Sequence, residues 1–421
     1  MILVLKRCIA ALTCILLMSA AQAQELAENL YTDYKEVLYQ IKIIDKESSQ
    51  KSTIGSGFLI NATGLAVTNY HVVSDYILSP DKNHIEVEDI SGNKSLASLV
   101  SFDVVNDLAL IQIELSTASE IFLPIAESLP TQGTTIYSLG NPHDLGMIVV
   151  PGTYNGLKKH SFYQKIHFTG SVNSGMSGGP VINESGHVIG VNVASAGNQL
   201  GFLVPLSKLK ALVQHDSIIQ TSDYKKVIAE QLTENQSELI KQLSTNEWPS
   251  TRLGMANVPD AMSEFISCWG DSNVDNQDAQ FLSVRKSCSL DQTIYVSNRI
   301  QTGHVGTQFQ WFSSDKLDRN RFYQLIDQRM NMHQQDFAHK QDFSEYECQL
   351  DTIKNKHDVQ SKSALCVKSY KEFAGLFDIV YVSATIDQDR ASLISQLNIN
   401  GITQASFEKL VPRFIDAVSW Q

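Results

Sequence analysis

The chain has 421 residues, of which 43% are hydrophobic and 19% charged, so it is long enough for two or three domains and is not typical of a disordered protein. Its formal net charge of −12 argues against a nucleic-acid-binding protein, because such a protein presents a basic face.

Residues 1–23 are typical of a secretory signal peptide. Lys6 and Arg7 give a positive start, the apolar run CIAALTCILLMSA follows, and the small residues Ala-Gln-Ala end at Ala23. The run is short for a membrane span, so cleavage is favoured over an uncleaved anchor. We expect a mature protein that is periplasmic or secreted and keeps no stable membrane anchor.

Residues 24–215 are predicted to form an all-β domain. From about Lys35 to Pro205, apolar runs of strand length alternate with Gly, Asn, Asp or Pro, as in HIEVED, DLALIQIEL and HVIGVNVA. Many short strands at this spacing indicate a sandwich or a pair of barrels. The run LSKLKALVQ then changes to helical spacing and closes the domain.

A histidine and several carboxylates in this region are candidates for proton transfer. His71 lies in AVTNYHVVSD, where a strand is predicted to end and a helical turn to begin. Asp107 opens the apolar strand DLALIQI, and Asp103 is its rival; Asp75 is expected to face solvent or to cap the local turn. Position alone does not select His71, because the chain has 11 histidines.

The stretch NSGMSGGPVIN surrounds Ser177 with glycines. A serine hydroxyl becomes a nucleophile only with a base, an orienting acid and donors for the oxyanion. Gly175 lets the backbone turn so that its N–H and that of Ser177 converge, while Gly178 and Gly179 allow close approach of a substrate. The alternative interpretation is a glycine-rich hairpin turn without chemistry.

A helical linker is predicted at 216–249, where the apolar stripe is sparse, and an α+β domain at 250–421. In that domain TIYVSNRI resembles IVYVSATI, and a cysteine pair precedes each copy, which indicates a duplication with repeats at about 260–335 and 340–421. Sequence proximity in an exported protein predicts two disulfides, Cys268 with Cys288 and Cys348 with Cys366. No motif indicates a metal or another cofactor.

The segments GSGFLI with TNYHVV, then NDLALIQI, then NSGMSGGPVIN together resemble the trypsin-like serine peptidase superfamily, most closely its bacterial HtrA-like branch. The resemblance spans roughly half of the mature chain and implies two six-stranded β-barrels with the site in the cleft. It implies His71 as base, Asp107 as orienting acid and Ser177 as nucleophile. It also implies an oxyanion hole formed by the N–H groups of Gly175 and Ser177.

The resemblance implies an exported serine endopeptidase that acts on protein or peptide substrates. Ser171 and Val172 would lie near the base of the specificity pocket, and since neither is charged, an aliphatic residue is expected before the scissile bond. Met176 stands where the family usually has Asn or Asp, which keeps an inactive, peptide-binding scaffold as the alternative. No PDZ domain is recognised at 250–421. The C-terminal domain in this range is expected to contact a partner protein.

Overall fold

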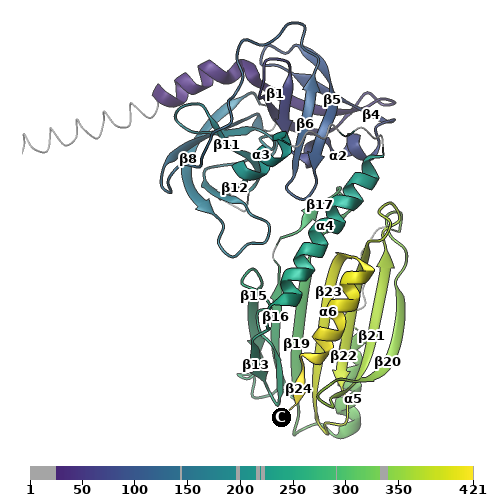
Figure 1. Cartoon of the computed structure of the whole chain (residues 1–421). Coiled ribbons are helices and arrows are strands. Elements are labelled where there is room, and N and C mark those ends of the chain that lie inside the picture. The colour runs from purple at the N-terminus through teal and green to yellow at the C-terminus, as the bar shows by residue number, and fades with distance from the viewer. Residues whose placement is uncertain are drawn as a thin grey trace, which may run out of the picture. The chain divides into compact units, whose positions relative to one another are not determined.

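The computed structural model describes residues 25–142, 145–195, 200–214, 219, 223–290, 292–331 and 340–420 (Figure 1). The predicted signal peptide lies outside the described residues. These residues divide into two compact units, one within Met1–Lys159 and Gln164–Ser222, the other within His160–Tyr163 and Asp223–Gln421. None of the helices in the described ranges is long and apolar enough to cross a membrane.

The first unit contains two closed, six-stranded antiparallel barrels, which confirms the predicted double β-barrel. The strands of the first barrel are β1 (Leu38–Asp45), β2 (Lys51–Leu59), β3 (Leu65–Thr68), β4 (Asn83–Glu88), β5 (Lys94–Asp103) and β6 (Leu108–Ile113). Those of the second are β7 (Thr135–Gly140), β8 (Ile148–Leu157), β9 (Ile166–Thr169), β10 (Pro180–Ile182), β11 (Val188–Ser195) and β12 (Gly201–Pro205). The barrels close in the orders β1-β2-β3-β6-β5-β4 and β10-β11-β12-β9-β8-β7.

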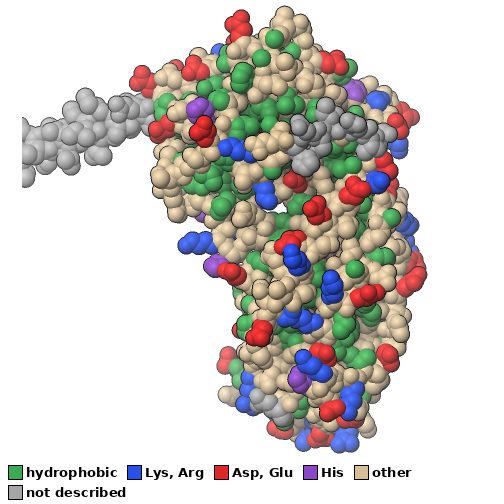
Figure 2. Space-filling model, viewed as in Figure 1, with side chains coloured by type: hydrophobic (Ala, Val, Ile, Leu, Met, Phe, Trp, Pro, Cys, Tyr) green, Lys and Arg blue, Asp and Glu red, His purple; other side chains and the backbone are tan. Residues whose placement is uncertain are grey.

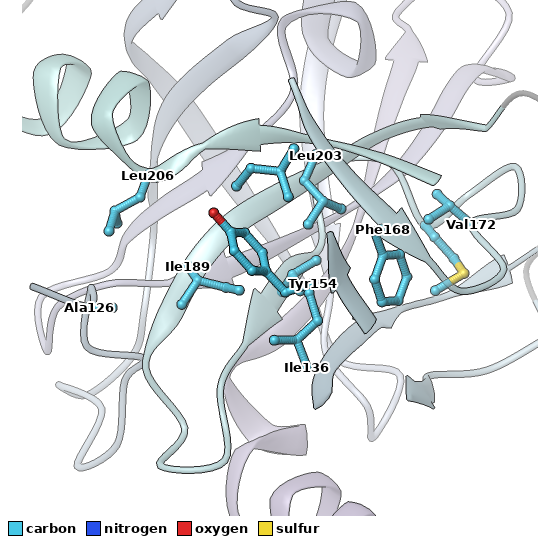
Figure 3. Packing of buried hydrophobic residues seen from close by; sticks show 11 residues of the cluster. Ala126, Ile136, Tyr154, Phe168, Val172, Ile189, Leu203 and Leu206 are labelled. Carbon is cyan, nitrogen blue, oxygen red and sulfur yellow. The ribbon is translucent and has the colours of Figure 1, made fainter. Parts of the chain in front are cut away.

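Alternating side chains explain why these short runs form barrels. In β4, Ile85 and Val87 are buried while His84, Glu86 and Glu88 are half-buried, the period of two expected for a strand with one face on a core. In the second barrel the side chains of Phe168, Ile189 and Leu203 fill the interior (Figure 3). Helical residues 25–34 and the 3₁₀ helix η1 (Lys35–Val37) precede β1. The barrels are also accompanied by α2 (Tyr70–Leu78) and α3 (Leu206–Gln214), and α3 is the predicted closing helix.

A seven-stranded antiparallel sheet forms the centre of the second unit. Its strands are β15 (Ser267–Ser272), β16 (Leu282–Ser289), β19 (Val305–Ser313), β20 (Glu347–Lys354), β21 (Gln360–Ser369), β22 (Phe377–Thr385) and β23 (Ala391–Ile402), in the order β15-β16-β19-β23-β22-β21-β20. Two small sheets accompany it, one of β13 (Ser250–Leu253), β14 (Ala256–Pro259) and β24 (Ser419–Trp420), the other of β17 (Ile294–Tyr295) and β18 (Gln301–Thr302).

Helices cover both faces of the large sheet. Phe309 and Tyr381 point to one face, where their rings lie 5.4 and 5.9 Å from Phe414 of α6 (Gln404–Asp416). Phe312 points to the other face, because it lies three positions along the strand from Phe309, and it packs with Phe322 of α5 (Arg319–Asn331). The α+β class predicted for the C-terminal domain is therefore confirmed.

Helix α4 (Tyr224–Thr245) belongs to this second unit, which differs from the prediction of a linker over 216–249. It lies beside α6 (Figure 1) and buries a stripe that includes Ile228, Leu232 and Leu239. The Asp223 side chain accepts a hydrogen bond from the Lys226 N–H and caps the first turn. The apolar stripe is sparse because only one narrow face of α4 packs against α6 and the sheet.

Charged side chains of both signs are interspersed over the face of the molecule in Figure 2. Exposed ion pairs of the second unit include Arg319 with Asp389 at 2.9 Å and Lys340 with Glu345 at 2.8 Å. Solvent screens such pairs, so they contribute little to the free energy of folding. The stability of this unit depends instead on its apolar faces and its cross-links.

Two disulfides clamp the outermost strands of the large sheet. Cys268 on β15 is bonded to Cys288 directly opposite on β16, and Cys348 on β20 to Cys366 directly opposite on β21. This is the pairing that the sequence predicts. The sequence repeat is less regular in space, since residues 294–295 form a strand outside the large sheet whereas 377–385 form a strand within it. The duplication therefore stays a prediction.

Reduction of the disulfides is expected to loosen the second unit and to leave the first unit folded. The bonds join cysteines 20 and 18 positions apart. Each should contribute about 3 kcal/mol by restricting the unfolded chain. Calorimetry of the mature protein with and without reductant measures this, and only the transition of the second unit should move. Equal shifts of both transitions would contradict the expectation.

Candidate active site

The Asp107 carboxylate binds both the ring and the backbone of His71. His71 lies in the first turn of α2, and Asp107 immediately precedes β6. Oδ2 of Asp107 lies 2.8 Å from His71 Nδ1, and Oδ1 accepts a bond of 2.9 Å from the His71 N–H. Because a carboxylate can only accept, Nδ1 is the protonated nitrogen, which leaves Nε2 of the neutral ring as an acceptor.

Asp107 has a left-handed backbone, with φ at 59°. Such a conformation costs an L-residue about 1–2 kcal/mol, and Asp is among the residues that tolerate it best. The fully buried Asn69 holds it, since its Nδ2 donates to the Asp107 carbonyl at 2.7 Å. This turn aims the carboxylate back at His71.

The two rival carboxylates have other partners. Asp103 accepts from the backbone N–H of Asn106 at 2.8 Å and from its side-chain Nδ2 at 2.6 Å, which closes a local turn. Asp75 accepts from the Thr53 hydroxyl at 2.9 Å. Within the described residues, the structure therefore brings only Asp107 of the three candidate acids to His71 through a hydrogen bond.

The loop around Ser177 leaves two backbone donors free. Most of its N–H groups are bonded within the second barrel: Met176 to the Asn173 carbonyl, Gly178 to that of Asn192 and Gly179 to that of Met176, each at 3.0 Å. Among the described residues, no acceptor pairs with the N–H of Gly175 or of Ser177. These are the two groups that the sequence analysis expects at an oxyanion hole.

Gly178 seats this loop directly against the segment that carries His71. A Cβ at Gly178 would lie 2.3 Å from the Ser56 carbonyl oxygen, 2.4 Å from Thr68 Oγ1 and 2.9 Å from the Asn69 nitrogen. Gly178 also has a φ of 85°, in the region that favours glycine. The loops of Ser177 and His71 thus meet at a contact that admits no side chain.

Met176 is fully buried in the core of the second barrel. It packs in the cluster that includes Phe168, Val172 and Leu203 (Figure 3). Gly140 packs closely against this residue, since a Cβ added at Gly140 would lie 2.9 Å from the Met176 Cα. A flexible apolar side chain thereby anchors the loop without any ion pair.

The two residues expected near the specificity pocket have different environments. Ser171 is exposed, whereas Val172 is 5% exposed and contributes to the same apolar cluster as Met176. The Val172 side chain is therefore part of the wall that supports the loop.

Sequence reasoning missed several polar residues around the pair. Asn69 and Ser56 lie inside the motifs TNYH and GSGF, but only their contacts reveal a role. Lys165 interacts electrostatically with two of the candidate acids. Burial lowers the pKa of its ammonium group, and the negative charges of Asp107 and Asp103 oppose that shift. Nothing in the residues around Lys165 indicates this environment.

Among the described residues, no group of three or more His, Cys, Asp or Glu side chains could hold a metal ion.

Comparison with known proteins agrees with this geometry. Residues 55–191 match the family model described as trypsin-like peptidase domain. The chain contains a trypsin-like peptidase domain. The match begins within β2 and ends within β11, so it includes His71, Asp107 and Ser177.

The peptidase domain is similar to bacterial proteins of the HtrA and DegP type. A probable serine protease do-like of Buchnera aphidicola is 33% identical over 180 residues, 40% of this chain and 36% of that protein. A probable periplasmic serine endoprotease DegP-like of Chlamydia pneumoniae is 32% identical over 164 residues, 38% and 32% of the two chains. The chain thus spans about a third of the length of these curated relatives.

A solved structure, the serine endoprotease from Yersinia pestis, is 25% identical with a TM-score of 0.39 and covers 45% of this chain and 65% of its own.

Gly178→Ala is expected to destabilise the peptidase domain strongly. The added Cβ meets two backbone atoms and adopts an unfavourable φ, so the loss of unfolding free energy should exceed about 3 kcal/mol. Gly133→Ala is the matched control, since Gly133 has a φ of 95° and nothing within 4 Å of an added Cβ. That variant should lose only about 1–2 kcal/mol. Urea unfolding of both variants measures the difference, and equal losses would contradict the steric argument.

Proposed function

We propose that the protein is an exported serine endopeptidase that cleaves peptide bonds through an acyl-enzyme on Ser177. The observation that carries the proposal is the Asp107 carboxylate bound at once to the ring and the backbone of His71. That arrangement fixes one tautomer and one orientation of the ring. It lies beside a loop with a serine and two unpaired N–H donors.

In the proposed reaction, His71 Nε2 takes the proton of the Ser177 hydroxyl as Oγ attacks the scissile carbonyl. The positive charge that develops on the ring is stabilised by Asp107. His71 then gives the proton to the leaving amine, and the C–N bond breaks. Water repeats the sequence on the acyl-enzyme, with His71 as base again, and Ser177 is regenerated.

The oxyanion of each tetrahedral intermediate would accept hydrogen bonds from the N–H groups of Gly175 and Ser177. Both groups lack a partner in the described chain, so they need not break a bond to bind the substrate oxygen. Fixed donors of this kind cost no reorganisation during the reaction.

Export and substrate class are part of the same proposal. The predicted cleavage after Ala23 supports a periplasmic or secreted protein, and one relative is named a probable periplasmic serine endoprotease. We propose unfolded or extended segments of envelope or extracellular proteins as substrates. We also propose that Ser171 lies near the base of the specificity pocket; because it is uncharged, such a pocket would favour a small or medium aliphatic residue before the scissile bond.

Ser177→Ala and His71→Ala should each lower kcat/KM by about 10⁴-fold or more without unfolding the protein. Asp107→Asn should be similarly severe, because the amide would favour the wrong tautomer of His71. Asp103→Asn is the matched control and should be mild, since Asp103 bonds to Asn106. A peptide digest with purified mature protein and labelling by a serine-directed phosphonate are the measurements. Folded wild-type protein that neither cleaves nor labels would favour the peptide-binding scaffold.

Met176→Leu should keep activity and Met176→Asp should lose it. Leucine has a similar volume and can fill the same apolar cavity, whereas an aspartate would bury a carboxylate among apolar side chains. Phosphonate labelling of both variants, each beginning at Gln24, measures this. Full labelling of Met176→Asp would contradict the anchoring role of the methionine.

A further inference from the structure

We propose that Ser56 is a positioning residue for the oxyanion hole, an inference that rests on the proposed peptidase function. Ser56 lies on β2 of the first barrel and is 1% exposed. Because it is buried, its side chain is not available to contact a substrate. Its contacts are with the loop that supplies the oxyanion donors.

The polar atoms of Ser56 join three segments. Its hydroxyl donates to the Gly175 carbonyl at 2.7 Å and accepts from the Asn141 N–H at 3.0 Å. Its backbone N–H donates to the Ser177 carbonyl at 2.8 Å. Its own carbonyl accepts from Thr68 Oγ1 at 2.8 Å. A single serine of the first barrel therefore bonds to both residues whose N–H groups are the proposed donors.

These bonds complete the anchoring of two peptide planes. In the plane between Gly175 and Met176, Ser56 Oγ holds the carbonyl, and the Asn173 carbonyl holds the N–H. In the plane between Ser177 and Gly178, the Ser56 N–H holds the carbonyl, and the Asn192 carbonyl holds the N–H. The two free donors lie next to these planes: the Gly175 N–H belongs to the plane between Ser174 and Gly175, and the Ser177 N–H to the plane between Met176 and Ser177.

Gly175 is the point at which this loop could rotate. Its φ is 93°, and glycine populates both signs of φ with little cost, so its own backbone does not hold the N–H in one direction. The Ser56 hydroxyl removes that freedom, because turning Gly175 would break the bond to its carbonyl. The loss would leave a buried acceptor and the Asn141 N–H unpaired. Ser56 thus makes the oxyanion hole rigid before substrate binds.

Ser56→Ala tests this role. It keeps the backbone bond to Ser177 and removes only the hydroxyl. We expect kcat to fall by about 10- to 100-fold while KM stays within about threefold, since the hydroxyl supports a transition-state interaction. The affinity for a peptide boronate, which forms a tetrahedral adduct on Ser177, should fall by a similar factor. The substrate is a fluorogenic peptide selected from a wild-type digest of casein.

Ser392→Ala is the matched control, because Ser392 is also fully buried and donates to the Thr385 carbonyl at 2.9 Å, but in the second unit. It should leave kcat and boronate affinity unchanged.

If Ser56→Ala does not fold, Ser56→Cys preserves the volume with a weaker donor and acceptor, and the same losses are expected. Wild-type kcat and boronate affinity in whichever variant folds would overturn the inference while leaving the peptidase function intact. Wild-type protein that neither cleaves the peptide nor reacts with phosphonate would overturn the proposed function and this inference with it.

Discussion

The bond between Asp107 and His71 is the interaction on which the rest of the site depends. One carboxylate holds the imidazole ring and the first turn of α2 together. Its position requires a left-handed backbone at Asp107, which Asn69 secures from the segment that precedes the helix. The side chains of Asp107 and Asn69 therefore join the start of strand β6 to the start of helix α2. Because the arrangement restricts the ring, it also selects which nitrogen can accept a proton.

The second barrel supplies a loop that is shaped by backbone contacts. Glycine at 178 allows the loop to lie directly against the first barrel, and Met176 secures it from the core side. Ser56 then ties both barrels together at the carbonyls of Gly175 and Ser177. The result is a loop with most polar groups paired and two donors left free, which is what charge stabilisation in a transition state requires. Apolar packing can thus replace an ion pair as the support of such a loop.

The second unit is built on a different principle. Its sheet is covered on both faces by helices, so most of its strands carry apolar residues on both sides. Its outermost strands, β15 and β20, have few buried side chains, and each is tied to its neighbour by a disulfide. Cross-links at the two edges compensate for the apolar contacts that edge strands lack. All four cysteines of the described residues lie in this unit, two at each edge of its sheet.

The sequence by itself predicted an all-β domain of sandwich or barrel type, the closing helix and the positions of the candidate residues, because period-two alternation and short motifs are local properties of the chain. The choice of a double barrel came from the resemblance that its three motifs carry. The sequence also predicted the cysteine pairs, which are neighbours in sequence. Residue patterns alone left Asp103 and Asp107 as rivals, and only the folded chain shows which carboxylate bonds to His71. The roles of Ser56 and Asn69, the burial of Met176 and the membership of α4 in the second unit were likewise decided by tertiary structure. Each depends on contacts between segments far apart in the chain, and no local pattern encodes such contacts.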